Sequence, residues 1–212
     1  KVFETDFFFY YTIANYEMNT VYIPYVNINN FFIDQFGSFD YKHANSILVT
    51  KILEASKNND NKKMVVHFNT GHFEIIVVQN QQLLLFNSFE YATPEDFLYY
   101  ILFTAEQLSL NPENFPLEII GNINEESPYY QLAYQYIRNI SLFDASSLQR
   151  SNSFSEAINR QHFILFNSWE SFQENTKEDA FNRQKTCRCV PLPIWVKKLY
   201  SMCWTIILIL KD

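Results

Sequence analysis

With 212 residues the chain is long enough for one large domain or two small ones, and it can bury a substantial core. It has 21 Phe and 14 Tyr but only 3 Gly. Scarce glycine argues against Gly-rich nucleotide-binding loops, which need the backbone to approach phosphate closely. The formal net charge of −7 and the lack of a basic stripe in the sequence disfavour a nucleic-acid partner.

The first part of the chain predicts short elements of mixed type. Residues 19–25 are expected to form a strand, followed by a short helix that is capped by Asn27 and ended by Gly37. A further short strand is predicted over residues 39–42 and a helix over residues 43–56.

The stretch from residue 64 to 121 is the most informative. Apolar, β-branched or aromatic runs of strand length occupy residues 64–68, 73–79 and 82–89. Residues 69–72 and 80–81 have the composition of turns, so these runs predict consecutive antiparallel hairpins.

A capped helix follows the hairpins. Thr93 can cap it, Pro94 suits the first helical position, and Glu95 and Asp96 lie in the positively polarised first turn. Carboxylates in the first turn stabilise the helix dipole, so a catalytic role is not needed to explain Glu95 and Asp96. Residues at helical spacing then define one apolar face: Phe97, Leu98, Ile101, Leu102, Ala105 and Leu108.

The rest of this region repeats the alternation of strand and helix. A returning strand at 117–121 precedes a second capped helix that runs from Ser127 to about Tyr136, with Leu132, Ala133 and Tyr136 expected to point inward. A short strand at residues 140–143, a mobile loop at 144–155 and a final strand at 162–167 are predicted next. The order after residue 63 predicts an α/β layer architecture with a mixed sheet.

The first hairpin contains the polar residues that could form a site. His67 and His72 lie five residues apart across a turn, and Glu74 shares the strand face of His72. Together with a further ligand they could bind Zn²⁺, but two polar side chains on the solvent face of a hairpin are the simpler interpretation. We therefore predict no metal site and no catalytic residue.

The turn itself allows two interpretations. Asn69, Thr70, Gly71 and His72 could form a phosphate-binding turn, or they could form a plain β-turn.

Two tyrosine pairs could also suggest a binding function. Tyr99-Tyr100 and Tyr129-Tyr130 could form a stacking platform for bases. Without basic residues around them, core packing or a protein interface is the favoured interpretation.

The run LLLFNSFEYATPEDFLYYILFTAEQL, followed by LEIIGNI and YQYIRNI, resembles a bacterial family catalogued as domain of unknown function 3822. The similarity covers about residues 19–168. Members of that family look like the actin, sugar-kinase and heat-shock-70 ATPase superfamily, whose domains are ribonuclease-H-like. The resemblance implies a protein with this fold and a further N-terminal domain of the same type that is missing from this chain. Residues 1–168 contain no cysteine, which suits a reducing cytoplasm, so we expect a cytoplasmic protein.

The same resemblance bears on function. In the ATPase superfamily the first hairpin of this domain carries an acidic, Gly-rich loop, which positions Mg²⁺ or the attacking water. Here His67 stands about where the acid would be, and Gly71 is the one glycine left. We therefore expect a non-catalytic interaction or scaffold protein with an unidentified protein partner, no cofactor, and no nucleic-acid or membrane partner. The alternative is a nucleotide-dependent kinase or ATPase that needs the missing N-terminal domain.

The predicted domain organisation follows from these elements. Residues 1–56 are interpreted as the remnant of a preceding α/β subdomain, 57–63 as a linker, 64–168 as the ribonuclease-H-like domain and 169–212 as a tail that looks non-native.

All cysteines and tryptophans lie beyond residue 168. A translation of codons allowed for this tail, read in another frame, is similar to the start of a bacterial 16S rRNA guanine-N2 methyltransferase, which suggests a frame slip. Its apolar run at residues 199–210 is too short to cross a bilayer as a helix, which takes roughly 20 residues.

Overall fold

The chain forms two compact units in the computed structural model: Lys1–Leu48 with Asn167–Asp212, and Val49–Phe166. The structure describes residues 9–13, 16, 18–37, 40–146, 153–168 and 206–209. Nearly all of the tail that was assigned to a frame slip lies outside these residues, so that interpretation stays a prediction, as do the predicted domain boundaries.

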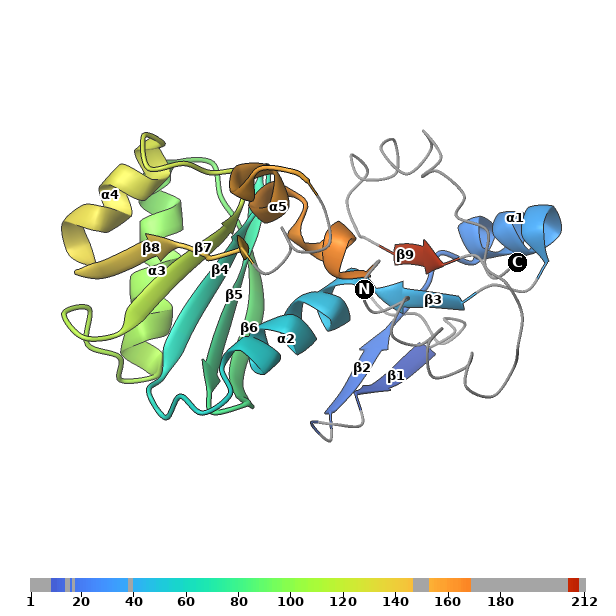
Figure 1. Ribbon diagram of the computed structural model, residues 1–212, viewed down its shortest axis with the longest axis horizontal. Coiled ribbons are helices and arrows are strands. Elements are labelled where there is room, and N and C mark those ends of the chain that lie inside the picture. Colours follow the sequence, from blue (N-terminus) through green and yellow to red (C-terminus); the bar gives the residue numbers. More distant parts are fainter. Residues whose placement is uncertain are drawn as a thin grey trace. The chain divides into compact units, whose positions relative to one another are not determined.

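The first unit contains two small antiparallel sheets and a helix (Figure 1). Strand β1 (Phe9–Ile13) pairs with β2 (Met18–Tyr22), and β3 (Asp40–His43) pairs with β9 (Ile206–Ile209). Helix α1 (Val26–Phe36) lies between them in sequence. The two strands and the helix that the sequence predicts in this part of the chain are therefore confirmed, apart from shifts at their ends.

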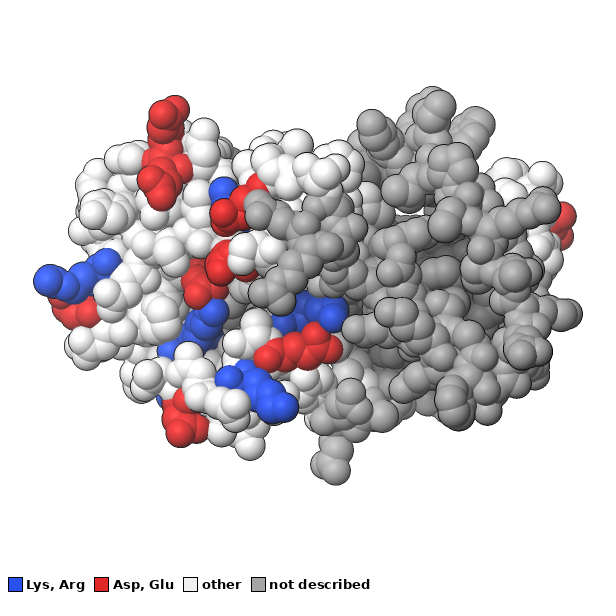
Figure 2. Space-filling view, in the orientation of Figure 1, with Lys and Arg blue, Asp and Glu red and all other residues white. Residues whose placement is uncertain are grey.

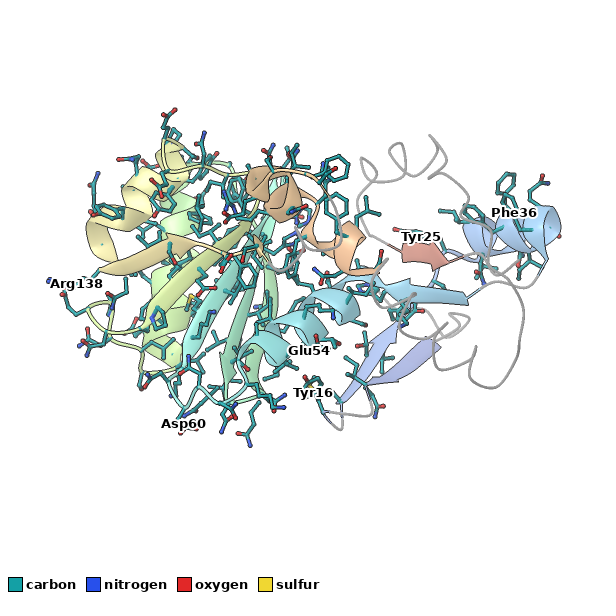
Figure 3. The ribbon with its side chains drawn as sticks, viewed as in Figure 1. Tyr16, Tyr25, Phe36, Glu54, Asp60 and Arg138 are labelled. Atoms are coloured by element: carbon teal, nitrogen blue, oxygen red, sulfur yellow. The ribbon has the colours of Figure 1, made fainter. Side chains whose placement is uncertain are left out.

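Helix α1 differs from the prediction at its start. Tyr25 is the N-cap and provides no side-chain cap, so the assignment of the cap to Asn27 is wrong. The predicted end is correct, because Gly37 has φ +75° and its N–H donates to the Ile33 carbonyl at 2.8 Å. No residue of α1 is buried, and Tyr25 and Phe36 at its two ends are both more than half exposed (Figure 3).

Helix α2 (Ala44–Ala55) carries the chain into the second unit, which is built on a five-stranded mixed sheet. The spatial order is β6-β5-β4-β7-β8, in which β4 pairs antiparallel with β5 and β5 with β6, whereas β4–β7 and β7–β8 are parallel. This confirms the predicted α/β architecture. The strands are β4 (Lys63–Phe68), β5 (His72–Gln79), β6 (Gln82–Glu90), β7 (Pro116–Gly121) and β8 (Asn139–Leu142).

Helices α3 (Pro94–Gln107) and α4 (Pro128–Tyr136) pack over one face of this sheet. The core between the helices and the sheet contains three aromatic rings in contact: Phe68 from β4, Phe73 from β5 and Phe97 from α3. The ring centroids are 4.9 Å apart for Phe73–Phe97 and 5.5 Å apart for Phe68–Phe97. Aromatic contacts of this kind add to the free energy gained by burying the rings.

The start of α3 forms as the sequence predicts. The Thr93 hydroxyl accepts a hydrogen bond from the Asp96 N–H at 3.2 Å, and the Asp96 carboxylate accepts from the Thr93 N–H at 3.0 Å. This is a complete capping box, which satisfies N–H groups that the helix leaves unpaired.

Two expectations about later helices are wrong. Tyr136 is 55 % exposed, because α4 ends there and the chain becomes extended at Ile137, which takes the buried position instead. The final strand predicted at residues 162–167 is also wrong: α5 (Glu156–Gln161) is followed by helix over residues 163–168. Asn159, Phe163 and Asn167 are buried at a spacing of four, which is the helical period.

Candidate functional site

The β4–β5 hairpin holds the polar residues that the sequence suggested as a site. In the antiparallel register His67 lies opposite Glu74, and Phe68 lies opposite Phe73. The Asn69 N–H donates to the His72 carbonyl at 3.1 Å, and Gly71 has φ +81°, so residues 69–72 form the expected tight turn.

Tyr91, the residue that follows β6, secures this turn. Its hydroxyl donates to the Asn69 carbonyl at 2.8 Å, and its N–H donates to the Gly71 carbonyl at 3.2 Å. Its ring also stacks against Phe68, with centroids 5.2 Å apart. Tyr91 therefore fixes two carbonyl groups of the turn, and the sequence analysis did not include this residue in the site.

His67 does not lie on a solvent face, so that interpretation is wrong for this residue, whereas His72 is partly exposed. Val66 and Phe68 point into the core under α3 and α4, and alternation along β4 places His67 on the other side of the sheet. That side is covered as well, and His67 and Glu74 are each only 5 % exposed.

The Glu74 carboxylate is the centre of a polar cluster. Its Oε2 lies 2.9 Å from His67 Nδ1 and 3.1 Å from Asn69 Nδ2, and its Oε1 lies 3.4 Å from His72 Nε2. A proton on His67 Nδ1 lets the imidazole donate to the carboxylate, and the Asn69 amide then donates to the same oxygen. His72 and Glu74 share a strand face, as predicted.

Burial and the two neighbouring histidines determine the charge state of Glu74. Burial by itself raises the pKa of the carboxyl, but the hydrogen bonds from His67 and His72 and the attraction of the two rings lower it to about 2. The hydrogen bond to Glu74 is also the main cause that raises the pKa of His72, against the opposing effect of burial. The cluster therefore holds an ionised carboxylate at neutral pH.

The cluster does not have the arrangement of a metal centre. Across the part of the chain that the structure describes, no group of three or more His, Cys, Asp or Glu residues is placed to hold a metal ion. The cluster can stabilise the buried negative charge of Glu74 and orient the His67 ring through its Nδ1 atom.

A cavity of about 420 Å³ opens next to the end of β7. Gly121 is at its edge, with φ +117°, and a side chain at this position would collide with the Phe68 carbonyl oxygen. Only glycine fits there, because the position combines left-handed backbone with contact to β4. The cavity, which the sequence analysis did not predict, is lined by Gly121, Asn122, Ile123, Asn124, Ser127, Ala157, Ile158 and Gln161.

The two tyrosine pairs pack in different ways. Tyr100 stacks on Phe89 with centroids 4.5 Å apart, Tyr129 contacts Phe97, and Tyr130 is buried. These three rings belong to the core, as the favoured interpretation expects, whereas Tyr99 is 60 % exposed. The structure thus does not bring the four rings together as a platform for bases.

Comparison with known proteins gives a family and a fold. A family model described as "Protein of unknown function (DUF3822)" matches residues 1–140. A crystal structure from Bacteroides thetaiotaomicron, of a protein with actin-like ATPase fold and unknown function, superimposes with a TM-score of 0.63 at 20 % identity. The alignment covers 78 % of this chain and 60 % of that chain, so this chain spans less than two thirds of the matched protein.

A second solved structure is much less similar. It is the foamy viral protease-reverse transcriptase dRH in complex with double-stranded DNA, with a TM-score of 0.25 and 15 % identity, covering 62 % of this chain and 28 % of that one. No curated protein matches the chain. In the described part of the chain, no helix combines the length and the apolar character that a membrane span requires.

Proposed function

Because the chain belongs to the DUF3822 family of proteins of unknown function and has an actin-like ATPase fold, we propose that it is a non-catalytic, cytoplasmic protein-interaction or scaffold protein. The observation that carries this proposal is that the Glu74 carboxylate has its hydrogen-bond partners within the protein. The carboxylate of the hairpin is buried and accepts from three donors, so its oxygens are already used within the fold.

Phosphate chemistry would need the opposite arrangement. The acid that such ATPases place in this hairpin must reach Mg²⁺ or the attacking water, and glycines must bring N–H groups to the phosphate. Here the position expected for the acid is His67, and Gly71 is the one glycine in the turn. The resemblance and the contacts of Glu74 together support a protein that has the ATPase fold but not the ATPase activity.

Phosphate binding at Asn69, Thr70, Gly71 and His72 stays a prediction. His72 favours it, because its raised pKa increases the fraction of the imidazolium form near neutral pH. The ionised Glu74 beside it opposes it, since an anion on this turn would lie close to a buried negative charge.

Nucleotide binding by the complete protein tests the proposal. We expect no change in unfolding free energy with Mg-ATP, measured by thermal shift and checked by isothermal titration. A stabilisation of about 2–3 kcal/mol at saturating nucleotide would contradict it. ATP with EDTA and Mg²⁺ without ATP are the controls, because they separate nucleotide binding from general ion effects.

The cavity beside Gly121 favours one second candidate, a nucleotide-dependent kinase or ATPase that obtains its metal-binding acid from another domain. The cavity lies at the carboxyl ends of the parallel strands β4 and β7, where α/β sheets commonly bind ligands.

A pair of variants tests this second candidate. Ser127→Leu would reduce the cavity, whereas Gln135→Leu adds the same side chain to an exposed position of α4 outside it. Adenosine binding that is lost in Ser127→Leu and kept in Gln135→Leu would support the candidate. Equal behaviour of both variants, or no binding at all, would rule it out.

A further inference from the structure

Helix α3 presents an aromatic pair to solvent. Tyr99 is 60 % exposed and Phe103 is 43 % exposed, and their rings stack with centroids 6.0 Å apart and planes at 19°. They lie four residues apart, on the side of α3 opposite to the buried Phe97, Ile101 and Ala105. Exposed rings that are gathered on one helix face are typical of interaction surfaces.

Carboxylates lie at both ends of this pair. Glu95 is one turn before Tyr99, and Glu106 is about one turn after Phe103, so the four residues form one stripe along the helix. Glu95 and Glu106 are both exposed, and neither forms an ion pair with any residue the structure describes. We call Glu95, Tyr99, Phe103 and Glu106 the α3 stripe.

The charged residues of α3 itself all have the same sign, although Lys62 Nζ donates to the Leu108 carbonyl at the carboxyl end of the helix at 3.1 Å. The sequence contains no Lys or Arg between Lys63 and Arg138, and Arg138 lies beyond α4, where its Nη1 is 3.6 Å from Glu113 Oε2 (Figure 3). The region over α2 differs, because Lys51 pairs there with Glu54 and both signs of charge lie side by side (Figure 2). Within this interval, the acids on α3 itself are Glu95, Asp96 and Glu106.

We propose that the α3 stripe binds a basic, Lys- or Arg-bearing segment of a partner protein. An Arg or Lys over the face of Tyr99 or Phe103 gains a cation–π interaction, and its neighbours on the partner can pair with Glu95 and Glu106. This inference rests on the proposed function and names the chemistry of the partner.

Charge complementarity separates this partner from the other occupants. A nucleic acid or an anionic membrane would bring phosphates towards Glu95 and Glu106 without any cation on α3 to neutralise them. A second copy in a two-fold contact would place the same carboxylates opposite each other. The α3 stripe spans about 16 Å of helix, which a partner helix of roughly eleven residues would match.

Selection of random 12-residue peptides displayed on phage tests the proposal, with the complete protein as bait and the Tyr99→Ser/Phe103→Ser variant for counter-selection. We expect the enriched peptides to carry several Lys or Arg. A synthetic copy of an enriched peptide should bind the double variant about tenfold more weakly than the wild type. Glu95→Gln/Glu106→Gln should weaken binding and reduce its dependence on salt.

Matched variants control for the loss of a ring and for the loss of charge. Tyr134→Ser removes a ring that is 61 % exposed on α4, and Glu125→Gln/Glu126→Gln removes the same charge outside the α3 stripe. Both controls should bind the peptide within about twofold of the wild type. Unchanged melting temperatures show that the variants are folded.

Several results would overturn the proposal. These are enrichment of neutral or acidic peptides, no enrichment, equal binding to the Tyr99→Ser/Phe103→Ser variant, or a dimer in sedimentation that this variant dissociates. The test is separate from that of the proposed function. If Mg-ATP stabilises the protein while basic peptides bind α3, only the non-catalytic role fails; if neither ligand binds, only the α3 inference fails.

Discussion

The two faces of the five-stranded sheet are built on the same alternation, yet they are filled differently. The face under α3 and α4 contains a continuous cluster of apolar side chains with stacked and edge-to-face rings. We call this the helical face. The opposite face is also mainly apolar, with Val65, Ile76, Val78 and Ile120 fully buried, but it includes two polar pairs, His67 with Glu74 and Lys63 with Glu118, the latter at 2.7 Å. We call it the polar face after these pairs. The comparison shows that a buried surface can be made of apolar side chains alone or can also include charged groups that pair with one another.

Mutations in the apolar cluster and in the polar pairs should reduce stability for different reasons. On the helical face a lost group costs the free energy of burial and of the cavity that remains. On the polar face each partner depends on the other, because an unpaired buried charge is far more costly than the pair itself. Mutations on either face can therefore test whether the two faces are maintained by different forces.

The largest effect is expected on the helical face. Phe97→Ala should reduce the free energy of unfolding by about 4 kcal/mol, because Phe97 is fully buried and contacts Phe68, Phe73 and Tyr129. Phe97→Leu, which keeps most of the volume, should cost only about 1–1.5 kcal/mol. Denaturation by urea measures both, and a loss below 1 kcal/mol for the alanine variant would show that this face is not closely packed.

The second largest effect should come from the polar face. Glu74→Ala is expected to cost about 3–4 kcal/mol, since it leaves His67 and Asn69 buried or half-buried without their acceptor. His67→Leu combined with Glu74→Leu should return to within about 1 kcal/mol of the wild type, because an apolar pair needs no partner. If the double variant is as unstable as Glu74→Ala, the polar face depends on volume in the same way as the helical face.

The sequence predicts the helical face much better than the polar one. Periodicity identifies the strands and α3, and local chemistry identifies the Thr93 cap, because these signals act between neighbours in sequence. The burial of Glu74 depends instead on what covers the second face, and the cavity beside Gly121 depends on segments far apart in the sequence. The apolar run at residues 162–167 has no clear period, so its length and composition suit either a strand or a helix.

The pH dependence of stability gives a third test. The folded pKa of Glu74 is about 2, below its ordinary 4.5, so its contribution is present above pH 4.5 and is lost as the pH falls towards 2. That loss corresponds to about 3 kcal/mol. The raised pKa of His72 acts in the other direction: its contribution is present below pH 6.5 and is lost as the pH rises through the folded value.

The cluster should therefore contribute most between about pH 4.5 and 6.5. Urea denaturation of the wild type and of Glu74→Gln across pH 2–8 checks this, because the glutamine variant should flatten both limbs of the curve. Phe97→Leu is the matched control from the other face and should keep the wild-type shape. Identical pH profiles for the wild type and Glu74→Gln would mean that other groups determine the dependence.

The smallest effect concerns the polar ends of the helices that cover the apolar face. Both α3 and α4 begin with a hydroxyl residue before proline, but Thr93 accepts from the Asp96 N–H, whereas the Ser127 side chain makes no capping hydrogen bond. Thr93→Ala should therefore cost about 1 kcal/mol and Ser127→Ala only a few tenths. Equal losses in urea denaturation would show that the hydroxyl acts on the unfolded chain rather than on the cap. A difference would show that even the apolar face depends on polar groups at the ends of its helices.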